Sequence, residues 1–77
     1  MGIKVLFFGV LGDRAGSSEK VYEGIPDTDT LEKTVAEEIE GLEEYSYVLS
    51  LNRMVIKENT VLNDGDEVAF LPPFAGG

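Results

Sequence analysis

The alternation of hydrophobic and polar residues divides this 77-residue chain into several short strand-like runs and one helical run. Ile3–Phe8 is rich in β-branched and aromatic residues and ends at Gly9, which predicts a first strand. Asn63–Asp66 is a strong turn signal, because Asp-Gly adopts positive φ at low cost. Four further strands are predicted at Glu19–Glu23, Tyr47–Leu51, Met54–Lys57 and Glu67–Leu71.

One helix is predicted in the middle of the chain. Thr30 is a good N-cap, since its hydroxyl can accept from a backbone N–H of the first turn, and Gly41 is expected to end the helix. The earlier segment Val10–Ser18 is predicted to be a turn or one short helical turn. The apolar side of the helix consists of residues at helical spacing: Leu31, Val35, Ile39 and Leu42.

These elements predict a single α+β domain over residues 1–77, with a small mixed sheet and one main helix packed on one face. Residues 72–77 are predicted to be a projecting, flexible C-terminal tail. The first and last strands are the most apolar and should be neighbours in the middle of the sheet. Strand alternation predicts the side chains that form the core under the helix with Leu31, Val35 and Ile39: Ile3, Val5, Phe7, Val68 and Phe70.

The opposite face of the sheet is also predicted to be apolar, which is unusual for a face that no helix covers. An apolar sheet face next to the end of the chain suggests a protein interface, and the alternative is ordinary scattered surface hydrophobes. The residues predicted to bind a partner there are Leu6, Phe8, Val48, Ala69 and Leu71.

Composition excludes several kinds of site. The chain contains no Cys and no His, so it cannot form a disulfide, a thiolate metal site or a cysteine nucleophile, and it lacks the commonest general base. The net charge of −9 argues against nucleic acid or an anionic membrane as a partner. Val5–Val10 is far too short to span a bilayer, and no signal-peptide layout is present. We therefore expect a cytoplasmic protein with no bound metal or cofactor.

The negative charge is concentrated in one part of the chain. Residues 23–44 carry a net charge of −8, whereas residues 1–22 carry +1. This pattern is typical of a solvated helix face that keeps a small protein soluble, and it could alternatively guide a basic partner. Glu40, Glu43 and Glu44 are expected to oppose the helix macrodipole.

The candidate chemistry lies at the end of the chain. Prolines stiffen the exit from the last strand, and glycines lack Cβ, so such a terminus can thread a narrow channel. The reactive group is the α-carboxylate of Gly77, which becomes a good electrophile when ATP converts it to an acyl-adenylate. The chain has no phosphate loop for that step, so we predict a substrate or carrier for another enzyme; a frayed terminus is the alternative. The tail-threading residues are Pro72, Pro73, Phe74, Ala75 and Gly76.

Three segments resemble the sulfur-carrier (small) subunits of molybdopterin synthase. Lys4–Phe8 and the fourteen residues Asp64–Gly77 carry most of the resemblance, and Leu51-Asn52 resembles the Val-Asn that precedes a turn in that family. The resemblance covers essentially the whole chain and implies the ubiquitin-like β-grasp fold. It also implies a protein that is not an enzyme by itself.

The resemblance further implies what happens at Gly77. A ubiquitin-activating-like adenylyltransferase would use ATP to adenylate this residue, which would then become a thiocarboxylate with sulfur from another protein. The thiocarboxylate would donate sulfur to the pterin precursor inside the synthase large subunit, in a heterotetramer. Two alternatives remain open: a β-grasp sulfur carrier of another pathway (thiamine, cysteine or tungsten-dependent), and a ubiquitin-like protein modifier or interaction domain.

Overall fold

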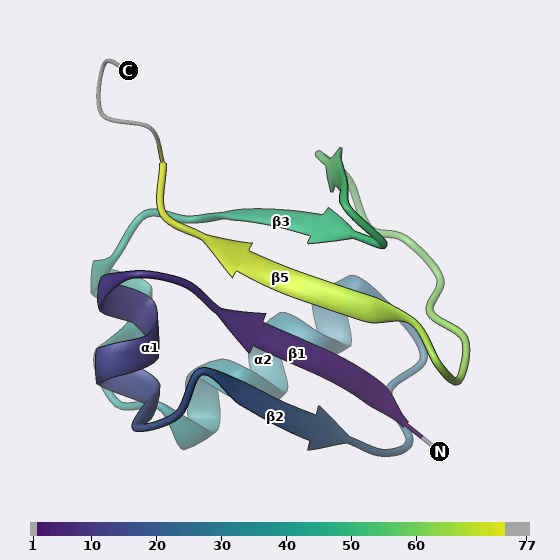
Figure 1. Ribbon diagram of the computed structural model, residues 1–77. Coiled ribbons are helices and arrows are strands. Elements are labelled where there is room, and N and C mark those ends of the chain that lie inside the picture. The colour runs from purple at the N-terminus through teal and green to yellow at the C-terminus, as the bar shows by residue number, and fades with distance from the viewer. Residues whose placement is uncertain (1, 74–77) are drawn as a thin grey trace.

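Five strands form one mixed sheet, and the main helix packs across one face of it (Figure 1). The computed structural model describes residues 2–73. The sheet order is β2-β1-β5-β3-β4; β1 and β5 are parallel, and the other neighbouring pairs are antiparallel. The first and last strands are therefore neighbours in the middle of the sheet, as predicted. The strands are β1 (Ile3–Phe7), β2 (Glu19–Tyr22), β3 (Val48–Leu51), β4 (Met54–Ile56) and β5 (Glu67–Leu71).

The main helix α2 begins earlier than the sequence suggested. It spans Thr28–Glu38, and its N-cap is Asp27, whose Oδ1 accepts a hydrogen bond from the backbone N–H of Thr30 at 2.9 Å. The prediction of Thr30 as N-cap was therefore wrong. Thr30 occupies the third helical position, where its N–H needs the acceptor that Asp27 provides.

Helix α2 also ends earlier than predicted. Its last residue is Glu38, whereas Gly41 has φ +84° and introduces a 3₁₀ turn, η1 (Leu42–Glu44). Glu40, Glu43 and Glu44 consequently lie just beyond the end of the helix, and their opposition to its macrodipole stays a prediction. Glu37 and Glu38 occupy the last turn instead, where no basic residue offsets the partial negative charge of the helix end.

A short helix, α1 (Val10–Ala15), connects β1 and β2 and is the helical turn anticipated for Val10–Ser18. Leu11 is fully buried, so α1 closes one end of the core. Arg14 Nη2 donates to the backbone oxygen of Glu40 at 3.0 Å, and its guanidinium lies over the ring of Tyr45. These contacts attach α1 to the segment that follows α2.

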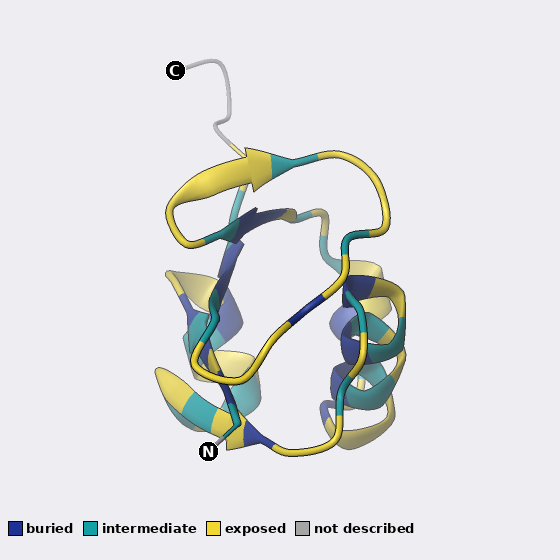
Figure 2. Cartoon of the chain, turned by 90° about the vertical axis from the view of Figure 1, so that its right-hand side faces the viewer, coloured by how far each residue is buried: buried dark blue, intermediate teal, exposed yellow. Residues whose placement is uncertain are grey.

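The core fills the space between the sheet and α2 (Figure 2). All eight predicted core residues are at most 3% exposed. The ring of Phe70 lies at its centre, 5.2 Å from the ring of Phe7 and 5.0 Å from that of Tyr47. Further core residues come from segments to which the sequence assigned no buried face: Leu11, Tyr22, Leu49 and Leu62.

Two tyrosine hydroxyls join the sheet side of the molecule to α2. The Tyr22 hydroxyl donates to Glu38 Oε1 at 2.9 Å, and the Tyr47 hydroxyl donates to Glu32 Oε1 at 2.8 Å. Burial, together with the neighbouring glutamate, raises the pKa of both tyrosines well above the usual range. Both hydroxyls therefore stay protonated and keep their role as donors.

Candidate docking face and tail exit

Strand register builds an apolar row across the face of the sheet that α2 does not cover. Leu6 of β1 lies opposite Ala69 of β5, Ala69 opposite Ser50 of β3, and Ser50 opposite Val55 of β4. Residues directly opposite each other in a sheet point to the same side, so these four side chains share one face. We call this the open face; it is turned toward the viewer in Figure 1.

The open face contains a groove of about 440 Å³. Phe8 is 46% exposed and Val55 is 57% exposed, so large apolar side chains meet solvent there. The lining residues are Leu6, Phe8, Ser50, Arg53, Val55, Glu67, Ala69 and Leu71. A contiguous apolar hollow of this kind is typical of an interaction site.

Four of the five residues predicted to bind a partner line this groove: Leu6, Phe8, Ala69 and Leu71. The fifth, Val48, lies opposite Leu71 in the β3–β5 register and is 37% exposed, but it lines a different pocket. Sequence reasoning missed Val55. The two-residue connection Asn52-Arg53 could have predicted its position. A turn this tight fixes the register of the two strands, and that register places Val55 opposite Ser50.

The predicted tail leaves the sheet beside the groove. The backbone N–H of Phe8 donates to the oxygen of Phe70 at 3.2 Å, which holds the end of β1 against the end of β5. Gly9 has φ +61°, and a Cβ there would lie 3.4 Å from Cγ of Pro72. Pro72 is partly buried and Pro73 is exposed. The remaining tail residues lie outside the described residues: Phe74, Ala75, Gly76 and Gly77.

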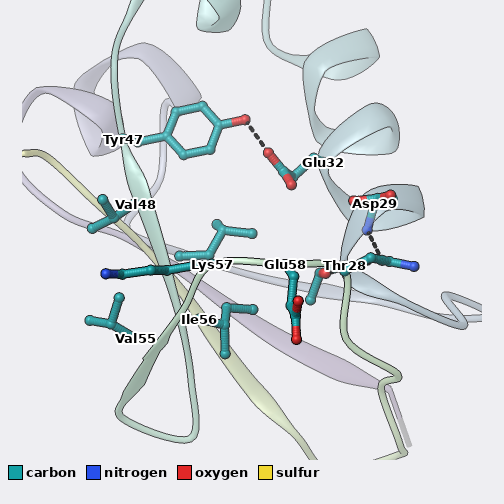
Figure 3. A pocket seen from close by; sticks show the side chains of 11 residues that line it. Thr28, Asp29, Glu32, Tyr47, Val48, Val55, Ile56, Lys57 and Glu58 are labelled. Atoms are coloured by element: carbon teal, nitrogen blue, oxygen red, sulfur yellow. Dashed lines mark hydrogen bonds between the residues drawn. The ribbon is translucent and has the colours of Figure 1, made fainter.

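A second pocket, of about 310 Å³, lies between the start of α2 and the β3–β4 hairpin (Figure 3). Several of its polar groups are hydrogen-bonded. Asn59 Oδ1 accepts from the backbone N–H of Asp29 at 2.8 Å, and Glu32 accepts the hydroxyl of Tyr47. Thr28 Oγ1 also accepts from the N–H of Thr60 at 2.9 Å. These bonds attach the segment after β4 to the start of α2, which is a structural role.

Residues 2–73 contain neither a candidate metal site nor a membrane-spanning helix. No cluster of three or more Asp and Glu side chains is arranged to hold a metal ion. No helix in this part of the chain is long and apolar enough to cross a membrane.

One helix across a five-stranded mixed sheet, with the first and last strands parallel at its centre, is the ubiquitin-like β-grasp fold. The model of the ThiS family matches residues 5–77. The chain therefore belongs to the ThiS family. The matched range includes β5 and the residues that follow it in the sequence.

Two curated relatives resemble the chain over nearly its full length. The molybdopterin synthase sulfur carrier subunit of Escherichia coli is 32% identical, over 97% of this chain and 99% of that protein. The protein of the same name in Chlamydomonas reinhardtii is 33% identical over the whole of both chains. The resemblance inferred from Lys4–Phe8 and Asp64–Gly77 is thus confirmed, and the relatives' names describe a carrier subunit, in agreement with the prediction that the chain is not an enzyme by itself.

Two solved structures also match. A chain in the protein–protein complex of subunits 1 and 2 of molybdopterin-converting factor from Helicobacter pylori has 31% identity and a TM-score of 0.74, with all of both chains covered. Small archaeal modifier protein 1 from Methanosarcina acetivorans has 25% identity and a TM-score of 0.74, over 97% of this chain and 95% of that one. The fold is thus similar to that of a chain in the molybdopterin-converting factor complex and to that of a small archaeal modifier protein.

Proposed function

We propose that this protein is the sulfur carrier of molybdopterin (molybdenum cofactor) biosynthesis. The observation that carries the proposal is where the central strand β5 of a ThiS-family fold ends: it runs directly into Pro72 and Pro73 beside an apolar groove. In the sequence these prolines are followed by Phe-Ala-Gly-Gly. The names of two relatives at 32% and 33% identity support the assignment. The chain itself has no Cys or His, so the catalytic groups would come from other proteins.

In this proposal the chemistry takes place at Gly77. A carboxylate oxygen attacks the α-phosphate of ATP in a ubiquitin-activating-like adenylyltransferase, and pyrophosphate leaves. Sulfide-level sulfur (HS⁻) delivered by another protein then attacks the acyl carbon, and AMP leaves as the C–O bond to its phosphate breaks. Loss of the sulfur's proton leaves the thiocarboxylate, so the step needs no oxidant or reductant. Gly76 and Ala75 are small enough to let the terminus pass through a narrow channel to the pterin precursor. The ATP belongs to the activating enzyme and is not bound by this chain.

We further propose that the open face binds the large subunit of molybdopterin synthase, in a heterotetramer of two small and two large subunits. Supporting this, the groove extends along β5 from Glu67 to Leu71 and so reaches the end of the sheet from which the tail leaves. Docking there would deliver the tail into the partner. The resemblance to a chain in a two-subunit complex points the same way. Because activation consumes ATP, we place this chemistry in the cytoplasm.

Substitutions on the open face test the docking role. Phe8→Asp and Leu71→Asp should each weaken binding of the large subunit at least tenfold, since each buries a charge at an apolar contact. Met54→Asp is the matched control, because Met54 is 73% exposed on β4 but does not line the groove. Isothermal titration with the large subunit from the same organism measures the affinities. Equal affinity for all three variants would rule out the open face as the interface.

The modifier function is the second candidate, and the similarity to small archaeal modifier protein 1 favours it. A modifier would be recovered from cells as adducts joined by an isopeptide bond to lysines of other proteins, whereas the proposed carrier would be recovered free or with the large subunit. A sulfur carrier of another pathway would not co-purify with the large subunit. Denaturing gels and affinity purification from native cells distinguish these cases.

A further inference from the structure

The turn between β3 and β4 places an arginine where the backbone favours glycine. Asn52 and Arg53 have φ of +49° and +74°, and they are the non-glycine residues with positive φ in residues 2–73. Both central positions of a two-residue hairpin turn with this twist need positive φ, and Asn-Gly is the preferred pair. Asn52 suits its position. Arg53 is a less suitable residue than glycine at its position. The conformation of the turn therefore does not explain why an arginine is present there.

This turn is held firmly to the start of β5. The backbone N–H of Asn52 donates to the oxygen of Glu67 at 2.7 Å, and the N–H of Glu67 donates to Asn52 Oδ1 at 3.0 Å. Asn52 Nδ2 also donates to Asp66 Oδ1 at 3.1 Å. Three hydrogen bonds thus fix the backbone from which the Arg53 side chain projects.

The Arg53 side chain lines the groove of the open face and remains largely free in solution. It is 90% exposed, and its Nε lies 3.9 Å from Glu67 Oε1, which is too long for a hydrogen bond. A guanidinium at the border of an apolar hollow is a common feature of protein interfaces, where arginine and aromatic residues contribute most of the binding energy. The cation is therefore available to a partner.

We infer that Arg53 selects the partner of the open face by binding a carboxylate on a protein segment whose apolar side chains fill the groove. A guanidinium binds a carboxylate through two parallel hydrogen bonds, which fixes orientation as well as charge. Charge distribution supports this choice of partner. Residues 23–44, on and around α2, carry a net charge of −8, so an acidic segment is repelled from the helix side. The groove carries one charge of each sign, Arg53 and Glu67, so a carboxylate meets less repulsion there and has the guanidinium as its partner.

This inference rests on the proposed docking of the large subunit, and the experiment separates the two. Affinity for the large subunit from the same organism is measured for the wild type and for Arg53→Gly, Arg53→Glu and Lys33→Glu. Glycine adopts φ +74° without strain, so Arg53→Gly keeps the turn while it removes the whole side chain, the guanidinium included. Lys33→Glu makes the same charge change as Arg53→Glu on the exposed side of α2. Thermal melting confirms that each variant is folded.

We expect Arg53→Gly to weaken binding about 10-fold or more, as for a lost charge-assisted hydrogen bond, and Arg53→Glu to weaken it further by repulsion. The affinity of Lys33→Glu for the large subunit should stay within about twofold of the wild-type affinity, because charges remote from an interface contribute little to binding. An Asp or Glu of the large subunit, changed to Arg, should restore binding of Arg53→Glu.

One result would overturn the role of Arg53, and a different result would overturn the proposed function. If the wild type binds, Phe8→Asp does not, and both Arg53 variants bind as the wild type does, the role of Arg53 is overturned while the docking face stands. If the wild type fails to bind the large subunit at all, the proposed function is overturned, and the inference that depends on it fails too.

Discussion

At the scale of single residues, Asp27 determines where the main helix starts. Its Oδ1 accepts the N–H of Thr30, and Asn59 Nδ2 approaches its other oxygen at 3.4 Å. Hydrogen bonds from Thr30 hold the pKa of Asp27 below its usual value of 3.8. The charged carboxylate is therefore the form that the folded state stabilises.

The contribution of Asp27 should depend on pH. Because its pKa is lower in the folded state, the stabilisation is present above the ordinary pKa and is lost as the pH falls through the folded-state pKa. Asp27→Ala should lower the melting temperature at pH 7, and Asp27→Asn, which keeps an oxygen acceptor, should lower it less. Urea unfolding at pH 7 and at about pH 2 should show the difference between the wild type and Asp27→Asn shrinking at low pH. A constant difference would mean that the carboxylate charge is irrelevant to the cap.

All four residues from Asp27 to Thr30 are of types that cap helices well, and nothing in their immediate neighbourhood in the sequence decides between them. Asp27 and Thr30 are both good N-cap residues, and the apolar pattern that begins at Leu31 favoured Thr30. The decisive partners lie far along the chain: Asn59 bonds to Asp27 and to Asp29. Helix boundaries fixed by tertiary contacts of this kind are not visible in a local pattern.

At the scale of elements, α2 is held to the sheet by apolar packing and by Tyr22 and Tyr47. The two hydroxyls reach Glu38 near the end of the helix and Glu32 near its start. Lys20 Nζ also lies 3.9 Å from Glu38 Oε1. Since the hydroxyl bonds are partly shielded from water, they contribute more than the exposed ion pair.

Replacing the tyrosines with phenylalanine tests their contribution. Tyr22→Phe and Tyr47→Phe should each reduce the free energy of unfolding by about 0.5–1.5 kcal/mol at pH 7, since the rings still pack. The pKa of each tyrosine is raised in the folded state, so this stabilisation is present below the ordinary value of 10.0 and is lost as the pH rises above it. Urea unfolding between pH 8 and about pH 11 should show the wild type losing more stability than the double variant. If the wild type and the double variant lost the same amount of stability over this pH range, the proposed contribution of the two hydroxyl hydrogen bonds would be contradicted.

Elements whose pattern spans several turns or a full strand were predicted well. Alternation along β1 and β5 predicted both the core and the open face, because successive side chains of a strand point to opposite faces of the sheet. On β5 the open-face side chains are only partly exposed or, at Ala69, buried. The short β4 was predicted as a strand, but three residues carry too little pattern to assign Val55 to a face. The end of α2 was misjudged because two buried residues beyond it continue the apolar spacing of the helix: Ile39, which is the C-cap residue, and Leu42, which begins the 3₁₀ turn η1.

At the scale of the whole molecule, charge is separated between the two sides of the sheet. Nine acidic residues and one basic residue lie between 23 and 44, which includes α2 and the turn after it. The groove of the open face is bordered by one residue of each sign, Arg53 and Glu67. Repulsion on the helix side should therefore cost stability without weakening the docking face.

Salt should relieve that repulsion. The melting temperature is expected to rise between low salt and moderate salt. At 0.1 M ionic strength, the repulsion between exposed charges more than about 10 Å apart is largely screened. A variant with Glu37→Gln and Glu40→Gln should melt higher at low salt and respond less to added salt, since both residues are exposed. Calorimetry over a salt series measures both effects. A melting temperature that is unchanged or lower at moderate salt would show that self-repulsion is not significant.

The sequence predicted single residues of the candidate site but not the groove that they form. Leu6, Phe8, Ala69 and Leu71 follow from alternation, and the role of the tail follows from Pro72–Gly77 in their context. The groove itself needs the register of four strands and the position of Arg53, which arise only when β3 and β4 fold beside β5. The chemistry at Gly77 remains a prediction.

The thiocarboxylate at Gly77 is the central claim, and its mass tests it most directly. Protein isolated intact from native cells should contain a form heavier by the exchange of one oxygen for one sulfur, and fragmentation should assign the change to Gly77. Added iodoacetamide should alkylate that form, because the sulfur is nucleophilic. A protein with one residue appended after Gly77 is the control and should never gain the mass. If cells that make molybdopterin actively yield only the unmodified carboxylate or an isopeptide adduct, the sulfur-carrier account is contradicted.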